Sequence, residues 1–276
     1  MPLHFHNSRI KLSQGTIFWR EVGYGPAIVF LHGSQSDSNQ WVSVMERLAT
    51  QYRCFAPDLL GFGDSERPNS LHYSINLEVE CLAEYMEALS LESVYLVAHS
   101  LGAWVAASYA LKNLEKVAAL VLLEPEGVRA EVKQKTPMGH RWLTWARLII
   151  YIVLRSLYPL AAALRLGKPI ERSLSKLRSL QQNPVASQLL FKRRPAEIES
   201  ELLNDRLPLL ELPALILQGE GDMPAIAARC ETLVELAPQA KLQVISPTTK
   251  DFPEAEPEIA AQLIGDWIAA NRQSYD

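Results

Sequence analysis

Short apolar segments of strand length alternate along this chain with longer segments of helical periodicity. The clearest apolar segments are residues 27–31 (AIVFL), 94–98 (VYLVA), 117–123 (VAALVLL) and 214–217 (ALIL). Continuous apolar runs of this length are typical of strands that are buried on both faces of a sheet. Strands that alternate with helices form β-α-β units, so the sequence predicts an α/β fold with a mostly parallel sheet flanked by helices.

Weaker patterns indicate the other elements. Strand signals stand at residues 16–22, 53–56 and 242–245. Helices are expected over residues 41–51, 75–89, 101–111, 224–236 and 256–270. In the second of these helices we place Glu78 among the polar positions, together with Glu80, Glu84 and Glu87.

One segment departs from this pattern in charge and composition. Residues 129–194 carry 14 Lys and Arg and only two acids, a net charge of +12. The rest of the chain has 13 bases and 29 acids, a net charge of −16. We interpret the chain as an acidic core, residues 1–127 and 209–276, that carries a basic, apolar, helical cap inserted over residues 128–208.

The cap contains a strongly apolar stretch, residues 141–158. Arg147 and Arg155 interrupt it, so it falls short of the roughly 20 apolar residues that a membrane span needs. Two interpretations stay open. The basic residues pair with the acidic core, or the stretch lies on an anionic membrane surface with Trp142 and Trp145 at the level of the headgroups.

Composition narrows the function classes. The formal net charge of −4 gives no reason to expect binding to nucleic acid. The cysteines Cys54, Cys81 and Cys230 are few and widely spaced, which indicates reduced, buried thiols rather than disulfides or a zinc site. We expect no metal and no cofactor. The first residues contain no apolar stretch of signal-peptide length, which predicts a cytoplasmic protein, with a peripheral membrane association still possible through the cap.

A candidate nucleophile stands where a buried strand runs into a helix. Residues 98–102 (AHSLG) follow the strand 94–98 directly and open the helix 101–111. A tight turn at this point would lift the Ser100 hydroxyl above the sheet, and the small flanking residues permit such a turn.

A second loop supplies candidate donors for a developing negative charge. Residues 32–34 (HGS) follow the apolar strand 27–31. Backbone N–H groups of Ser34 and of Leu101, at the positive end of its helix, would form an oxyanion hole. An ordinary glycine turn is the alternative interpretation of this loop.

These motifs and three others make the chain resemble the α/β-hydrolase superfamily, in its branch of small soluble proteins. The landmarks in the family's order are residues 31–33 (LHG), 57–65 (PDLLGFGDS), 98–102 (AHSLG), 217–222 (LQGEGD) and 252–257 (FPEAEP). The resemblance implies that Ser100 is the nucleophile and Asp222 the acid of a triad, with Glu124 in reserve. It implies that Asp58 and Asp64 are structural aspartates of their loop.

The chain departs from the family at the catalytic histidine. Its histidines are His4, His6, His32, His72, His99 and His140, and none follows the candidate acid Asp222. Asp251 stands where the family has a histidine before the Phe-Pro pair. Imidazole titrates near working pH, whereas an ordinary aspartate, with a pKa near 3.9, is a weak base.

Other groups are candidates for the missing base. We expect His99 to point away from the pocket, His32 to serve a structural role and His72 to be exposed. His140 lies in the cap, from which it would have to reach the nucleophile. Lys250 would form a Ser–Lys pair only if it were desolvated, and an exposed lysine is the simpler expectation.

Three functions remain open at this point. The first is a serine ester or acyl hydrolase, or an acyl-transfer enzyme, that acts on a small hydrophobic or lipid-like substrate with an incomplete triad. The second is a catalytically degenerate member of the family that binds a ligand or another protein. The third is association with an anionic membrane surface through the cap, which is compatible with either of the others.

Overall fold

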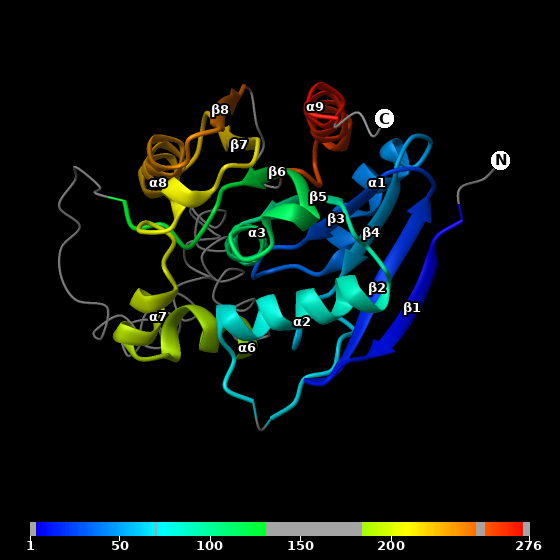
Figure 1. The fold of residues 1–276 in the computed structure, drawn as a ribbon, viewed down its shortest axis with the longest axis horizontal. Helices are drawn as coiled ribbons and strands as arrows, with labels where there is room; N and C mark the ends of the chain where they lie inside the picture. Colours follow the sequence, from blue (N-terminus) through cyan, green and yellow to red (C-terminus); the bar gives the residue numbers. More distant parts are fainter. Residues whose placement is uncertain (1–3, 70, 131–183, 247–251, 273–276) are drawn as a thin grey trace, which may run out of the picture. The chain divides into compact units, whose positions relative to one another are not determined.

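The computed structural model describes residues 4–69, 71–130, 184–246 and 252–272 (Figure 1). The chain divides into two compact units, Met1–Val132 with Arg193–Asp276, and Lys133–Lys192. Most of the second unit lies outside the described residues; its described part is α6 (Pro184–Ser187) and a π-helical turn (Gln188–Lys192). The helical cap over residues 128–208 therefore stays a prediction.

The first unit is built on a sheet with the strand order β1-β2-β4-β3-β5-β6-β7-β8. The pairs β1–β2 and β2–β4 are antiparallel and all other pairs are parallel, so the predicted fold class is confirmed. The strands are β1 (His6–Lys11), β2 (Thr16–Gly23), β3 (Ala27–Leu31), β4 (Arg53–Pro57), β5 (Val94–His99), β6 (Val117–Leu123), β7 (Ala214–Gly219) and β8 (Ala240–Ile245).

Helices cover both faces of this sheet. In Figure 1, α1 and α9 lie together on one face, and α2 and α3 lie side by side on the other. The helices of this unit are α1 (Val42–Leu48), α2 (Ile75–Ala88), α3 (Leu101–Ala110), α7 (Pro195–Glu201), α8 (Pro224–Leu236) and α9 (Pro257–Ala270). Short 3₁₀ helices lie at Ser38–Trp41, Leu114–Lys116 and Leu207–Leu209.

The register of the parallel strands brings several loops to one edge of the sheet. Leu31 of β3 pairs with Ala98 of β5, and His99 of β5 pairs with Leu123 of β6. Leu123 in turn pairs with Leu217 of β7. The carboxyl ends of these strands therefore lie in one row, which is where parallel α/β folds carry their sites.

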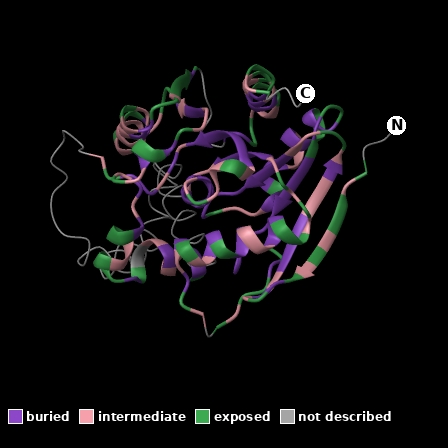
Figure 2. Cartoon of the chain, viewed as in Figure 1, coloured by how far each residue is buried: buried purple, intermediate pink, exposed green. Residues whose placement is uncertain are grey.

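The central helix α3 is buried along its whole length (Figure 2). Its alanine-rich sequence lets it approach the sheet closely. A Cβ on Gly102 would lie 2.6 Å from the carbonyl oxygens of Leu31 and His32, so only glycine fits there. This contact presses the first turn of α3 against the end of β3.

Two details differ from the sequence-based expectations. The sequence patterns did not indicate β1, because this edge strand is mostly exposed and carries no apolar run (Figure 2). The placement of Glu78 among the polar positions of α2 is wrong, since the residue is only 1% exposed. Its carboxylate faces the core, where Glu78 Oε2 accepts the buried N–H of Leu60 at 3.1 Å.

Candidate active site

Ser100 forms the turn between β5 and α3 in a strained backbone conformation. Its φ of +51° and ψ of −111° lie in a region that L-residues rarely adopt. The turn is held by hydrogen bonds from the Ser100 N–H to the carbonyl of Leu123 (2.9 Å) and from the Ala103 N–H to the carbonyl of Ser100 (3.1 Å). Such a turn raises the hydroxyl above the end of the sheet, as a nucleophile elbow requires.

The residue after Ser100 offers one candidate oxyanion donor. Leu101 is the first residue of α3, so its N–H has no acceptor within the helix. The aligned peptide dipoles of α3 add positive potential at the same point. This N–H is therefore suited to stabilise negative charge beside Ser100.

The loop after β3 lies against the elbow. A Cβ on Gly33 would be 3.5 Å from Ser100 Cβ and 2.5 Å from His99 Nδ1. The Gly33 N–H donates to Gln40 Oε1 at 2.9 Å, and the Gly33 carbonyl accepts from Ser36 N–H at 3.2 Å. The structure therefore brings the candidate donor loop of Ser34 next to the candidate nucleophile.

His32 has the structural role that was expected. Its Nε2 accepts from the Leu59 N–H at 3.0 Å, which leaves the proton on Nδ1 to donate to the Gly33 carbonyl at 2.9 Å. Burial lowers the pKa of His32, which keeps the imidazole neutral. The ring thereby joins the loop after β3, through Gly33, to the loop after β4, through Leu59. With both nitrogens engaged, His32 is not available as a base.

Two other candidate histidines lie within the described residues, and neither replaces the missing base. His99 Nδ1 lies 3.0 Å from Gln40 Nε2, and burial, with a smaller contribution from His32, lowers the pKa of His99 to about 4. His72 is exposed, as expected, and its Nε2 lies 3.1 Å from Glu197 Oε2. The candidates His140, Lys250 and Asp251 lie outside the described residues.

The candidate acid Asp222 lies in the turn after β7. Its Oδ2 accepts the Gly219 N–H at 2.8 Å, and burial raises its pKa. Asp222 is half-buried at the same edge of the sheet as Ser100, but β6 separates the strands that precede the two residues. A common pocket for Ser100 and Asp222 stays a prediction.

The reserve acid Glu124 follows β6, the strand next to Ser100. It has a left-handed φ of +45°, and its N–H donates to the Leu217 carbonyl at 3.2 Å. Like Asp222, it is only partly buried. Both acids therefore leave the sheet at its carboxyl edge.

The loop after β6 contains an acid that the sequence patterns did not single out. The Glu126 N–H donates to the Ser100 carbonyl at 3.3 Å, and Arg229 Nη2 of α8 lies 3.2 Å from Glu126 Oε1. Burial raises the pKa of Glu126 although Arg229 opposes the shift. No motif marks these residues, because their contact joins segments about 100 residues apart.

Asp58 organises the loop after β4. It is 2% exposed, and its two carboxylate oxygens accept the N–H groups of Ser38 (2.6 Å) and Asp64 (2.7 Å). Gly63 approaches the same carboxylate so closely that a Cβ would lie 2.1 Å from it. Asp58 is thus structural, as expected, whereas the Asp64 side chain is exposed and the structural contact of that residue is its N–H.

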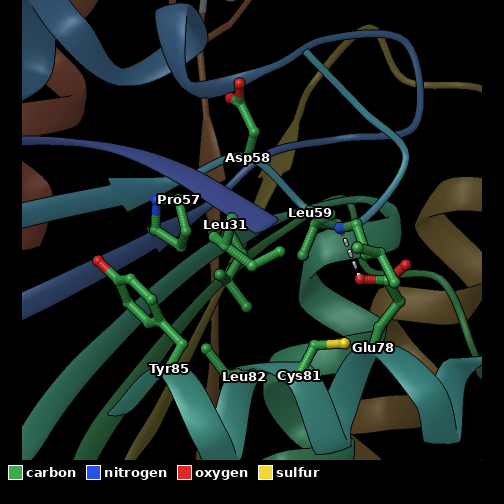
Figure 3. A pocket seen from close by; sticks show the side chains of 10 residues that line it. Leu31, Pro57, Asp58, Leu59, Glu78, Cys81, Leu82 and Tyr85 are labelled. Atoms are coloured by element: carbon green, nitrogen blue, oxygen red, sulfur yellow. Dashed lines mark hydrogen bonds between the residues drawn. The ribbon is translucent and has the colours of Figure 1, made fainter. Parts of the chain in front are cut away.

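A small cavity of about 20 Å³ lies between α2 and the ends of β3 and β4 (Figure 3). Its lining is mostly apolar. Glu78, Cys81 and Tyr85 of α2 face it, while the Asp58 carboxylate turns away from it. Burial raises the pKa of Glu78 to about 8. This volume holds about one water molecule and is far below that of a ligand pocket. The cavity lies between α2 and one face of the sheet rather than at the elbow.

The cysteines agree with the sequence-based expectation. Cys54, Cys81 and Cys230 are buried free thiols.

Within residues 4–69, 71–130, 184–246 and 252–272, no cluster of three His, Cys, Asp or Glu side chains is placed to hold a metal ion. In those same ranges, no helix combines the length and the apolar character that a membrane crossing requires.

The fold and the elbow agree with a family assignment. The model of a family described as alpha/beta hydrolase fold matches residues 26–250, so the chain belongs to the α/β-hydrolase family. The match starts just before β3 and includes the elbow. It thereby confirms the resemblance seen in the sequence motifs.

Known relatives of the chain have diverse names. It is 36% identical over 115 residues to 2-hydroxy-6-oxo-2,4-heptadienoate hydrolase of Pseudomonas putida, a match that covers 41% of this chain and 42% of the relative. It is 33% identical over 135 residues to 1-acylglycerol-3-phosphate O-acyltransferase of Mus musculus, covering 46% of this chain and 38% of the relative. The matches therefore span less than half of either relative.

A solved structure extends the likeness to nearly the whole chain. The crystal structure of a bacterial membrane phospholipase A superimposes with a TM-score of 0.75 at 22% identity, covering 98% of this chain and 87% of that chain. At this level of identity the likeness concerns the fold. The reaction must be argued from the site.

Proposed function

We propose that this protein is a serine-type hydrolase or acyl-transfer enzyme that acts on an ester of a small hydrophobic or lipid-like molecule. The observation that carries the proposal is the strained turn at Ser100, with the Leu101 N–H on one side and the Gly33–Ser34 loop on the other. A backbone held in such a conformation costs about 1–3 kcal/mol. That cost has an explanation if the turn presents a nucleophile.

The chemistry would proceed in two steps. Ser100 Oγ attacks the carbonyl carbon of the ester, the bond from that carbon to the alcohol oxygen breaks, and the alcohol leaves with the serine proton. Water or a second alcohol then attacks the acyl-serine and releases the acid or a new ester. The N–H groups of Ser34 and Leu101 would stabilise the oxyanion in both steps.

The proposed reaction needs a general base, and the histidine that serves as the base in the family is missing from this chain's triad. We propose Asp251 at the position of the family's histidine, with Asp222 as its partner acid. Loss of the histidine base in a Ser-His-Asp triad can cost about 10⁶ in kcat, although binding and oxyanion donors retain roughly 10³–10⁴ over water. Turnover is therefore expected to be slow.

The alternative is a member of the family that binds a ligand and turns over nothing. The absence of a histidine after residue 140 favours it. Labelling with a fluorophosphonate separates the two functions, since the probe forms a bond between phosphorus and an activated serine oxygen as fluoride leaves. Time-dependent labelling that disappears in Ser100→Ala supports the enzyme. No labelling of the folded wild-type protein at millimolar probe over hours supports the binding module.

A second candidate function is attachment to an anionic membrane surface through the basic segment. The charge of +12 over residues 129–194 on an otherwise acidic chain favours it. Each Lys or Arg near such a surface contributes about 1 kcal/mol, so several together would give reversible binding. Attachment would bring lipid esters to the site, and one structural relative is named for a membrane phospholipase.

A further inference from the structure

The Gln40 side chain lies between the two loops that carry the candidate oxyanion donors. Gln40 is 4% exposed. Its Oε1 accepts the Gly33 N–H at 2.9 Å, and its Nε2 lies 3.0 Å from His99 Nδ1. A single buried amide thus joins the loop after β3 to the residue that precedes the nucleophile.

The chemistry of the partners determines which way the amide faces. A backbone N–H can only donate, so the Gly33 N–H requires the oxygen of the Gln40 amide on its side. The NH₂ group then faces His99 Nδ1, which must accept and therefore carries no proton. Neutral His99 holds its proton on Nε2, and burial keeps it neutral by lowering its pKa to about 4.

The same contacts orient the candidate oxyanion donor. The Gly33 carbonyl accepts from His32 Nδ1 at 2.9 Å and from the Ser36 N–H at 3.2 Å. A trans peptide is planar, so the Ser34 N–H of the same peptide points the opposite way. Gln40 holds one side of Gly33 and His32 the other, and together they determine the direction of the Ser34 N–H.

Gln40 itself is firmly anchored. It belongs to the short 3₁₀ helix Ser38–Trp41, whose Ser38 N–H donates to the buried carboxylate of Asp58 at 2.6 Å. The next residue, Trp41, is fully buried against Phe30 of β3, with ring centroids 5.2 Å apart. The amide is therefore a rigid link and not a mobile surface group.

We propose that Gln40 is a positioning residue of the candidate oxyanion site, because its amide sets the placement of the Ser34 N–H relative to Ser100 by binding Gly33 and His99 at once. Gln40 touches no reacting atom. The inference rests on the proposed function for the use of that placement, while the link itself can be tested without any reaction.

Two substitutions separate the two halves of the link. Gln40→Met keeps the length of the side chain and removes both hydrogen bonds. Gln40→Glu keeps an acceptor for the Gly33 N–H but replaces the donor to His99 by a second acceptor. Ser65→Ala is the matched control, since its buried hydroxyl also donates one hydrogen bond and accepts one, to Asp58 O and from the Phe18 N–H.

The first measurement is made on the whole folded chain without substrate. Amide exchange at Gly33 should be at least about tenfold faster in Gln40→Met and close to wild type in Gln40→Glu and Ser65→Ala. The imidazole ¹⁵N signals of His99 at neutral pH should show an unprotonated Nδ1 in the wild type and a protonated Nδ1 in Gln40→Glu. A protonated Nδ1 in the wild type, or unchanged Gly33 exchange in Gln40→Met, would overturn the proposal.

The second measurement is the rate of fluorophosphonate labelling of Ser100. We expect it to fall about tenfold in Gln40→Met and to stay near wild type in Ser65→Ala, at matched fractions of folded protein. Faster Gly33 exchange with an unchanged labelling rate would overturn the positioning role. If the wild type does not label at all, the proposed enzyme fails, and exchange and imidazole signals alone decide whether Gln40 makes the link.

Discussion

Gly33 and His99 are in direct contact, so close that a Cβ on residue 33 would lie 2.5 Å from His99 Nδ1. Gln40 Nε2 lies 3.0 Å from the same nitrogen and holds the ring in place. The absence of a side chain at position 33 is thus what lets the loop after β3 pack against the elbow.

This contact predicts the effect of Gly33→Ala. The added methyl would overlap the His99 ring, and overpacking of this kind costs about 1–3 kcal/mol of unfolding free energy. Fluorophosphonate labelling of Ser100 should slow as well. Gly265→Ala in α9 is the control, since its nearest neighbour would be Leu48 Cδ2 at an ordinary 3.5 Å, and alanine there should stabilise the helix slightly. Urea unfolding measures both variants; equal stability of Gly33→Ala and wild type would contradict the prediction.

Backbone strain at Ser100 predicts a trade between stability and reactivity. Glycine adopts the observed φ of +51° without penalty, so Ser100→Gly should raise the unfolding free energy by about 1 kcal/mol. Ser100→Ala keeps a Cβ and should show no such gain. Both variants should lose probe labelling. Thermal unfolding compares them, and a glycine variant no more stable than the alanine variant would argue against strain.

The buried carboxyl of Glu78 predicts a dependence of stability on pH. Its pKa is raised from 4.5 to about 8 in the folded protein by burial. Between these values the unfolded chain releases the proton and the folded chain retains it, so stability falls as pH rises from about 4.5 to 8. Below 4.5 both states are protonated, and the penalty is absent.

Glu78→Gln should remove that dependence. The variant keeps an acceptor for the Leu60 N–H and carries no charge, so it should be more stable than wild type at pH 8 and similar at pH 4. Glu80→Gln, an exposed position on the same helix, is the control and should leave the pH profile unchanged. Unfolding in urea across this range tests the difference; parallel profiles for wild type and Glu78→Gln would refute it.

The proposed position of the missing base predicts a gain of function. Asp251→His would place an imidazole before Phe252, and general bases typically contribute about 10²–10⁴ in rate. Hydrolysis of an activated ester should rise at least about tenfold and increase with pH through the range in which imidazole loses its proton, near 6.5. The double variant Asp251→His with Ser100→Ala should lose the gain. A folded Asp251→His protein without new Ser100-dependent activity would count against this geometry.

Membrane attachment predicts co-sedimentation with anionic vesicles and none with neutral vesicles. Binding should weaken at high salt and in the double variant Arg147→Glu with Arg155→Glu. The double variant Arg9→Glu with Lys112→Glu changes the net charge by the same amount. Both residues are exposed and lie outside the basic segment, so this variant should bind as wild type does. No binding at low salt, or binding indifferent to lipid charge, would support pairing between the basic segment and the acidic core.

The sequence by itself determined the fold class and the parallel strands of the sheet. Runs such as 117–123 are apolar throughout and only seven residues long, which favours a strand that is buried on both faces of a covered sheet. Ser100 was found in the same way, since a strand signal ending at Ala98 and a helix signal starting at Leu101 leave room for nothing but a tight turn. These patterns involve residues that are close in the sequence, so they can be recognised without knowledge of the tertiary structure.

Tertiary structure alone decided the partners of each side chain. Gln40 reads as an ordinary polar residue before Trp41, and its link between Gly33 and His99 exists only once β3 pairs with β5. Glu78 matched the polar pattern of α2, yet the fold buries it against the loop after β4, where it accepts the Leu60 N–H. Burial and pairing arise from segments distant in the chain, and these set the pKa values and orientations on which the proposed chemistry depends.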